Sequence, residues 1–565
     1  MQDEIVRIEQ KTTTLRGRSL AITATSGLLA ILIATATWAQ SPEQQPDSSR
    51  MATGSPTNRL TKGIPHPISR SGESNSENGG PRSARTLSVI PGQQTSALST
   101  WVSLVNQMPG TNDPLVTPGE ALLLTDGRVM AQDSGTGDWW LLTPDSFGSY
   151  VNGTWTQAAT MPYAPLYFAS AVLPDGRVLV EGGEYVDFAL TWTNQGAIYD
   201  PASDTWQSVA PPEGWFNIGD AQSVVLANGT FMLANAFTTE TALFDAHSLT
   251  WSPTGTGKAT TNDEEGWTLL SSGKVLTVDS GNFDDPTHSE LYNPATGSWS
   301  SAGSTGVQLV DFGPGSSFSF EIGPQVLRPD GTVFVAGATG HTAIYDSKTG
   351  RWTAGPDFPL SPDGQLDVAD GPAALLPNGN VLVAASPGIF NNGTRFFEFD
   401  GRSLTEVASR PDAANHSSFE FFSLVLPTGE ILVTNSNDGN GSMVYASVGG
   451  ARGGWAPEIE SAPDTIQAGN SYTLTGSRLN GLSQGAAYGD DAQSATNYPL
   501  VRITNRATGH VFYARTHDHS SMAIGLRAES STQFDVPANI EAGPSKLTVV
   551  TNGIPSESVR VVVVR

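Results

Sequence analysis

The sequence predicts an all-β fold, in which a seven-bladed β-propeller is followed by a β-sandwich. Three observations support this prediction: a composition rich in turn residues, an apolar hairpin pattern that recurs seven times, and a change of pattern near residue 455. The chain has 565 residues, enough for more than one domain, and it holds 60 Gly and 37 Pro but only 15% charged residues. Such a composition is typical of many short strands joined by turns.

Charge and cysteine content exclude several classes of function. The net charge is −26, from 55 acidic and 29 basic residues. Because phosphate groups are bound by clustered Lys and Arg, nucleic acid and anionic membrane surfaces are not expected partners. The chain has no cysteine, so disulfides, thiolate metal sites and cysteine nucleophiles are excluded.

The N-terminal segment predicts export from the cytoplasm. Four basic residues come first: Arg7, Lys11, Arg16 and Arg18. An uncharged run follows at 19–38, and residues 37–39 fit a small-x-small cleavage site, with 34–36 as a second choice. Residues 1–39 therefore have the pattern of a signal peptide, but a run of about 20 residues can also span a bilayer as an uncleaved N-terminal membrane anchor. Either way we expect an extracytoplasmic protein, secreted or anchored.

Residues 40–100 predict a disordered linker. Ser, Pro, Gly and Asn dominate this stretch, which includes the run SRSGESNSENGGPRSAR. A segment that buries so little apolar surface cannot offset the entropy lost on ordering.

A hairpin pattern recurs from Trp101 onward: an apolar strand, a turn that ends in Gly, and a second apolar strand. The seven glycines are Gly127, Gly176, Gly229, Gly273, Gly331, Gly379 and Gly429. Their spacings of 44 to 58 residues match the period of a propeller blade. The Asp-Gly and Asn-Gly pairs among them favour tight turns, which need a positive φ.

A second pattern, an aromatic residue followed by a polar turn and a Trp, comes after the middle hairpins and predicts the outermost of four strands in each blade. The segment 101–109 resembles such an outer strand with no blade before it, whereas the last hairpin has none after it. We therefore expect the strand at 101–109 to close a propeller that spans 101–450. Six tryptophans are expected in the blade cores: Trp101, Trp155, Trp206, Trp251, Trp299 and Trp352.

Residues 455–565 have a different pattern, in which runs such as IQAGNSYTLTGS and SVRVVVVR predict an Ig-like sandwich. The tail also carries the runs ATNYPLVR, RTHDHSSM, FDVPA and NGIPS. With these runs, the order of export signal, seven-bladed kelch-type propeller and C-terminal sandwich resembles the galactose oxidase and glyoxal oxidase family over about residues 101–565. The resemblance implies that His517, which follows a Thr on this strand, is a metal ligand at the mouth of the propeller.

The copper-radical site of that family is not expected here. The resemblance implies a radical cofactor made from a Tyr bonded to a Cys, and this chain has no Cys. The family's Tyr-His pair before the last hairpin is replaced by Phe419 and Glu420. A copper-tyrosyl radical and the matching oxidase activity are therefore not expected.

A different site is predicted on the face opposite the hairpin turns. The residue nine positions before the hairpin Gly is acidic in four blades: Asp220, Glu264, Asp370 and Glu420. In the blade around Gly331 this position is Ile322, with Glu321 one residue earlier. Because the strand before the hairpin is the innermost of its blade, these carboxylates are expected to converge as an acidic ring. The alternative is that they are solvated or accept bonds from neighbouring backbone N–H groups.

Two functions from different classes remain. The favoured one is a binding or scaffolding protein without chemistry of its own, with a carbohydrate or another cell-surface molecule as ligand, stacked on Trp192 or Trp215. The other is an enzyme in which the carboxylates and His517 hold a metal or act as acid and base. Oxygen-rich ligation favours Ca²⁺ or Mn²⁺, and an imidazole shifts the choice towards Mn²⁺ or Zn²⁺.

Overall fold

The structure is a computed structural model that describes residues 99–109, 116–311, 319–438 and 441–565. The expected export segment and all but the last two residues of the expected linker lie outside this range. The described residues form strands and three short 3-10 turns, η2 (Ala413–Asn415), η3 (Ser418–Glu420) and η4 (Gly453–Trp455), with no α-helix among them. The prediction of an all-β fold is therefore confirmed. None of the helical turns described could form a membrane span.

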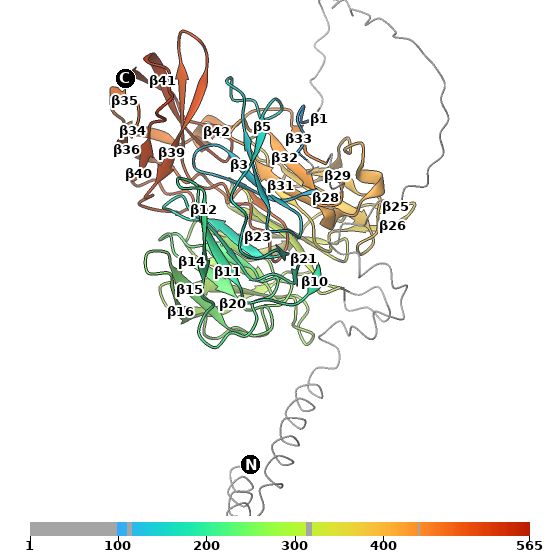
Figure 1. Ribbon diagram of the computed structural model, residues 1–565. Helices are drawn as coiled ribbons and strands as arrows, with labels where there is room; N and C mark the ends of the chain where they lie inside the picture. Colours follow the sequence, from blue (N-terminus) through green and yellow to red (C-terminus); the bar gives the residue numbers. More distant parts are fainter. Residues whose placement is uncertain (1–98, 110–115, 312–318, 439–440) are drawn as a thin grey trace, which may run out of the picture. The chain divides into compact units, whose positions relative to one another are not determined.

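Between residues 100 and 446 the described chain forms seven antiparallel sheets, and each contains a row of four strands in which every strand pairs with the next (Figure 1). Sheets 1 to 3 consist of β2 (Pro118–Leu123), β3 (Val129–Asp133), β4 (Trp139–Thr143) and β5 (Thr154–Gln157); β7 (Ala169–Val172), β8 (Val178–Glu181), β11 (Gly196–Asp200) and β12 (Thr205–Val209); and β13 (Ser223–Val225), β14 (Phe231–Ala234), β15 (Thr241–Asp245) and β16 (Thr250–Thr254). Sheets 4 and 5 consist of β17 (Thr268–Leu269), β18 (Val275–Val278), β19 (His288–Asn293) and β20 (Ser298–Ser304); and β21 (Ile322–Leu327), β22 (Thr332–Gly337), β23 (Thr342–Asp346) and β24 (Arg351–Ala354).

Sheets 6 and 7 complete the series. Sheet 6 consists of β27 (Ala373–Leu375), β28 (Val381–Pro387), β29 (Arg395–Phe399) and β30 (Leu404–Glu406), extended by β25 (Leu360–Ser361) and β26 (Gly364–Asp367). Sheet 7 consists of β31 (Phe421–Val425), β32 (Ile431–Asn435), β33 (Met443–Ala446) and the N-terminal β1 (Thr100–Ser103). A further short sheet consists of β6 (Pro165–Leu166), β9 (Tyr185–Val186) and β10 (Ala189–Leu190). In the sequence, β6 precedes the first strand of sheet 2, and β9 and β10 lie between its second and third strands.

The hairpin glycines have the backbone conformation that the sequence pattern predicts. All seven have φ between 79° and 91°. In the first hairpin the Gly127 N–H donates to the Leu124 carbonyl oxygen over 3.0 Å, and the Leu124 N–H donates to the Arg128 carbonyl oxygen over 2.8 Å. Because only glycine adopts this conformation at no steric cost, each of these turns needs its Gly.

The outer-strand tryptophans join neighbouring sheets. Trp206 stands opposite Tyr199 in sheet 2, and its indole N–H donates to the Ala159 carbonyl oxygen, just beyond β5 of sheet 1, over 2.9 Å. Trp155 reaches the Asn106 carbonyl oxygen in the same way, over 3.0 Å. Four of the six are only half-buried, in line with their place on outer strands: Trp101, Trp206, Trp251 and Trp352.

Residues 458–564 form a separate group of strands around a core that includes Ile466, Leu474, Ile503, Phe534 and Leu547. Its strands are β34 (Glu458–Ser461), β35 (Thr465–Gln467), β36 (Ser471–Ser477), β38 (Leu500–Asn505), β39 (Val511–His517), β40 (Ser530–Asp535), β41 (Gly543–Thr551), β42 (Ile554–Pro555) and β43 (Val559–Val564). They carry the colours at the C-terminal end of the bar in Figure 1.

Between β36 and β38 the chain leaves this group and enters the space between the inner strands of the seven sheets. We call residues 484–498 the central segment. Its short strand β37 (Ala486–Ala487) pairs with β27 of sheet 6. Leu269 of sheet 4 donates its N–H to Gln484 Oε1 over 2.7 Å, Tyr488 donates to the Phe419 carbonyl oxygen over 2.6 Å, and Tyr498 donates to the Leu123 carbonyl oxygen of sheet 1. The segment is almost entirely buried, so it fills the centre of this group of sheets.

Candidate functional site

Three of the four acidic residues predicted from the repeat lie together at the centre. Glu264 belongs to two groups of carboxylates, one with Asp220 and Asp490 and the other with Glu321 and Asp370. Within each group, one oxygen of each residue lies within 4.8 Å of the others. We call these five residues the central carboxylates.

The repeat places these side chains because each precedes the innermost strand of its sheet. Asp220, Glu264 and Asp370 come shortly before β13, β17 and β27, and Glu321 directly precedes β21. Glu264 and Asp370 have φ of 55° and 59°, and Tyr167, which aligns with them in sheet 2, has φ of 53°. A non-glycine residue in this left-handed region is uncommon and costs about 1–3 kcal/mol. The shared conformation indicates that the aligned positions are structurally equivalent.

Asp490 and its neighbour Asp491 come from the central segment, and the sequence analysis missed both. They are 3% and 1% exposed. One oxygen of Asp491 accepts the Ala492 N–H over 2.7 Å, and the other is buried without a hydrogen-bond partner. Gly489 allows the close approach, because a Cβ at that position would lie 2.7 Å from Asp370 Oδ1. One feature of the sequence could have indicated them. The two Asp residues are adjacent and lie in a run of small residues that lacks the alternation of apolar and polar residues expected of a sandwich strand.

The central carboxylates and Asp491 are buried close to one another, so their negative charges repel. Burial, and then the nearby carboxylates of Glu264, Asp491 and Asp370, raise the pKa of Asp490 well above its usual value. The pKa of Asp491 is raised by burial and next by Asp370. Burial raises the pKa of Glu120 on β2 to about 8, against a hydrogen bond from Ser170 that lowers it. Such repulsion is relieved either by protonation or by a bound cation.

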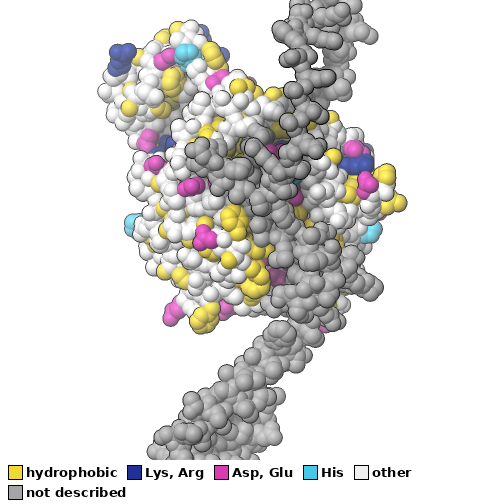
Figure 2. All heavy atoms as spheres, turned by 45° about the vertical axis from the view of Figure 1, so that its right-hand side comes forward, with side chains coloured by type: hydrophobic (Ala, Val, Ile, Leu, Met, Phe, Trp, Pro, Cys, Tyr) yellow, Lys and Arg dark blue, Asp and Glu magenta, His cyan; other side chains and the backbone are white. Residues whose placement is uncertain are grey.

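Few basic side chains lie on one outer face of the described residues. The face drawn in Figure 2 shows few Lys and Arg side chains among scattered Asp and Glu, in line with the net charge of −26. A negative field of this kind attracts cations and not anions.

Glu420, the fourth acid of the predicted ring, is not brought into the centre. The turn η3 replaces the start of the innermost strand there, and the carboxylate of Glu420 is hydrogen-bonded to His416 Nδ1. His416 forms another group with Asp412 and Asp438. Both oxygens of Asp412 are held by Arg410 at 2.7 Å, so this group is already partly neutralised.

His517 does not face the central carboxylates. It ends β39, where Nδ1 lies 2.9 Å from Asp518 Oδ2 and Nε2 lies 3.2 Å from Asp535 Oδ1. The next residues dock on the hairpin turns instead, with the His519 N–H donating to the Pro174 carbonyl oxygen over 3.1 Å. The expectation that His517 approaches the acidic ring is corrected accordingly: Asp490 of the central segment, and not this histidine, is the residue of the tail that reaches it.

Trp192 and Trp215, the two aromatic residues predicted to stack on a ligand, lie near the segment that precedes Asp220. The Trp192 ring packs against Phe237 with centroids 5.4 Å apart, and the next residue, Thr193, accepts the Ile218 N–H over 3.0 Å. Trp215 is buried, whereas its neighbour Phe216 is 93% exposed. The aromatic surface offered to a ligand here is therefore that of Phe216 more than that of Trp215.

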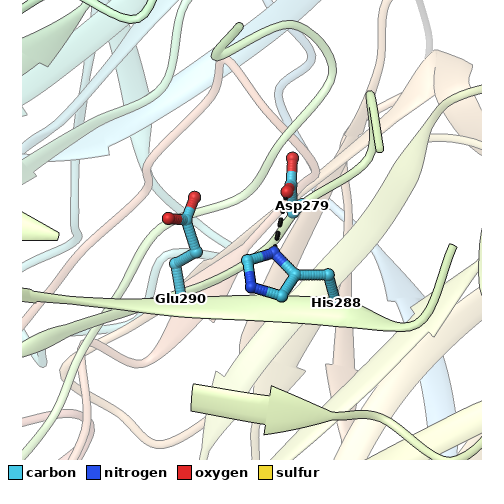
Figure 3. A group of neighbouring side chains, drawn as sticks. All are labelled: Asp279, His288 and Glu290. Atoms are coloured by element: carbon cyan, nitrogen blue, oxygen red, sulfur yellow. Dashed lines mark hydrogen bonds and ion pairs between the residues drawn. The ribbon is translucent and has the colours of Figure 1, made fainter. Parts of the chain in front are cut away.

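A further group, Asp279, His288 and Glu290 in sheet 4, has the residue types of a metal site (Figure 3). Its cation is already present, because the buried ammonium of Lys258 lies 2.7 Å from Glu290 Oε2 and 2.8 Å from Glu265 Oε1. Burial opposes ionisation of Asp279, but Lys258 and several hydrogen bonds lower its pKa. We interpret this group as a buried ion-pair network that stabilises sheet 4.

Comparison with known proteins agrees with the repeat pattern. No protein-family model matches the chain. The kelch-like protein terF of Aspergillus terreus is 28% identical over 268 residues, which are 42% of this chain and 54% of that protein. The chain thus matches about half the length of this relative.

Two solved structures also match the chain over much of its length. A fungal alcohol oxidase of the AA5 family, in complex with copper, is 15% identical, with 80% of this chain and 86% of that chain covered and a TM-score of 0.37. The WD40 β-propeller domain of Doa1 is 12% identical, with 62% of this chain and 97% of that chain covered and a TM-score of 0.39. The kelch-like relative agrees with the kelch-type repeat that the sequence predicts.

Proposed function

We propose that this chain is an extracytoplasmic binding protein that holds a hard divalent cation in its central carboxylates. In this proposal the seven four-stranded sheets are the blades of a kelch-type propeller, β1 closes the ring, and residues 455–565 form an Ig-like domain. The observation that carries it is the meeting of Asp490, from the tail, with Asp220 and Glu264, from two different sheets, within 4.8 Å. Two oxygens on one Ca²⁺ are separated by at most about 5 Å, since each bond is about 2.3–2.6 Å long.

The donor set indicates which cation is favoured. All five central carboxylates offer oxygen, and His517 binds Asp535 elsewhere. Oxygen ligands favour Ca²⁺ or Mn²⁺ over Zn²⁺. Buried carboxylates whose pKa values are raised by one another gain most from such an ion, because it removes the repulsion that burial has strengthened.

A carbohydrate is the ligand class that best fits the surroundings. Phe216 is 93% exposed and stands four positions before Asp220. In this proposal the exposed Phe216 ring is a stacking face for the apolar side of a sugar, while the cation takes hydroxyl oxygens. Export of the chain by its N-terminal segment is part of the proposal, because it supplies the setting in which such ligands occur.

An enzymatic function is the second candidate, and Glu120 is the observation that favours it. Its pKa of about 8, raised by burial, allows it to hold a proton near neutral pH, and its charge acts on Asp491. A protonated carboxyl beside a metal site can serve as a general acid. A copper radical oxidase is not proposed, since the chain has no Cys.

Metal analysis and thermal unfolding of the purified full chain test the proposal. We expect Ca²⁺ or Mn²⁺ to co-purify or to raise the Tm of EDTA-treated protein. Asp490→Asn should abolish this shift, while the control Asp363→Asn, at an exposed acid outside the centre, should retain it. Absence of bound metal together with no shift for Ca²⁺, Mn²⁺, Mg²⁺ or Zn²⁺ would refute the proposal.

A further inference from the structure

We infer that the central carboxylates form two adjacent cation sites that share Glu264 as a bridging ligand, so that the filled centre is dinuclear. This inference rests on the proposed function and extends it. One site consists of Asp220, Glu264 and Asp490, and the other of Glu264, Glu321 and Asp370.

The shared residue is the geometric basis of the inference. In each group one oxygen of Glu264 lies within 4.8 Å of one oxygen of each of the two other acids. A carboxylate has two oxygens and can bind a different ion with each. Two-metal sites in proteins have ions about 3.5–4 Å apart, a separation that one bridging carboxylate can span.

Asp491 supplies an independent observation. Its side chain is 1% exposed, and Oδ2 is buried without a hydrogen-bond partner. Its carboxylate interacts electrostatically with Asp370 of one site and with Asp220 of the other. A buried carboxylate oxygen without a donor is relieved by a proton or by a cation, and we infer that the pair of ions supplies the cation.

The charge balance also favours two ions. Ionised, the five central carboxylates and Asp491 carry a formal charge of −6, so one divalent cation leaves −4 and two leave −2. Asp220, Glu321, Asp370 and Asp490 are each less than 9% exposed. Four uncompensated charges in such a buried place would repel strongly, and a second cation halves the charge that remains.

The backbone holds the bridge in place. Glu264 lies in the left-handed region with φ of 55°, as does Asp370 with φ of 59°. Strained positions of this kind persist where the surrounding structure fixes them, and they fix the direction of the side chain in turn. Glu264 and Asp370 therefore hold defined backbone conformations in the connections just before β17 and β27.

Manganese serves as the probe, since it has both a measurable stoichiometry and an EPR signal. EDTA-treated full-length protein is titrated with Mn²⁺, the bound metal is counted by mass spectrometry, and the spectrum is recorded. We expect two Mn²⁺ per chain with an exchange-coupled signal. Asp490→Asn and Glu321→Gln should each leave one Mn²⁺ with an uncoupled six-line signal, and Asp363→Asn should behave as wild type.

The outcomes separate this inference from the proposed function. One Mn²⁺ per wild-type chain, or two without exchange coupling, would overturn the bridged centre and leave the cation-binding function standing. No bound Mn²⁺, Ca²⁺ or other divalent cation would overturn both. The wild-type spectrum decides the question even if a variant fails to fold.

Discussion

Trp101 packs against Tyr445 with ring centroids 4.9 Å apart, and the two residues pair across β1 and β33. The Trp101 indole N–H donates to the Ala408 carbonyl oxygen, just beyond β30 of sheet 6, over 2.6 Å. Trp206 makes the same two contacts, with Tyr199 in its own sheet and Ala159 in the sheet before. The first strand of the described chain therefore completes the last sheet as the other outer strands complete theirs.

Loss of this strand should destabilise all seven sheets. A chain that begins at Gly110 should unfold at a lower temperature than one that begins at Thr95, because sheet 7 would lose its outer strand and expose an edge. Trp101→Ala should cost about 2–4 kcal/mol, somewhat less than a fully buried Trp. Thermal unfolding followed by circular dichroism measures both changes. Equal melting of the two truncated chains would contradict closure by β1.

Lys258 should be among the most sensitive positions outside the centre. Lys258→Met removes the ammonium that Glu265 and Glu290 bind and leaves buried carboxylates without a counter-charge. Breaking a buried pair in this way costs about 3–5 kcal/mol. Urea unfolding should show that loss, while the control Lys348→Met, at an exposed lysine, should change stability by less than about 0.5 kcal/mol. A small effect of Lys258→Met would mean that solvent or another cation replaces the ammonium.

The repeat pattern predicted the hairpins, the outer-strand tryptophans and three of the central acids, because these depend on local sequence at a fixed distance from each hairpin Gly. Glu420 shares that distance, but η3 replaces the strand start there and turns the residue towards His416. Asp490 was not predictable from any repeat. Its position depends on a long-range feature of the fold, namely that the central segment enters among the inner strands. This feature leaves no periodic signal in the sequence.

His519 should make stability depend on pH in mildly acidic solution. Burial, and next the charge of His517, lower its pKa to about 3 from an ordinary value of 6.5. Between these values the unfolded chain binds a proton that the folded chain does not, so stability is complete above pH 6.5 and falls as the pH decreases. This residue alone should cost about 1.4 kcal/mol between about pH 7.5 and pH 5.5.

The variant His519→Gln isolates that contribution. Its free energy of unfolding, measured with urea in EDTA, should decrease less than that of the wild type over the same pH interval, by about 1.4 kcal/mol. An identical decrease in the two proteins would show that His519 is free to take up a proton in the folded state.

Substitution of Gly489 by Ala should lower the affinity for the cation, because it changes the geometry of the site and not its charge. A methyl group there would lie 2.7 Å from Asp370 Oδ1, so Gly489→Ala must displace either the carboxylate or the central segment. We expect Mn²⁺ affinity, measured by isothermal titration calorimetry, to fall about tenfold or more, which corresponds to roughly 1.4 kcal/mol. Gly454→Ala is the matched control, because nothing lies within 4 Å of its added methyl group. Equal affinities of the two variants would contradict the placement of Gly489 beside the site.

The measurement that tests the central claim most directly is anomalous diffraction from crystals grown with Mn²⁺, recorded near the manganese absorption edge. We expect anomalous density among Asp220, Glu264 and Asp490, with a second peak among Glu264, Glu321 and Asp370. Crystals with no anomalous density among these carboxylates, or with density only beside Asp412 and His416, would contradict it.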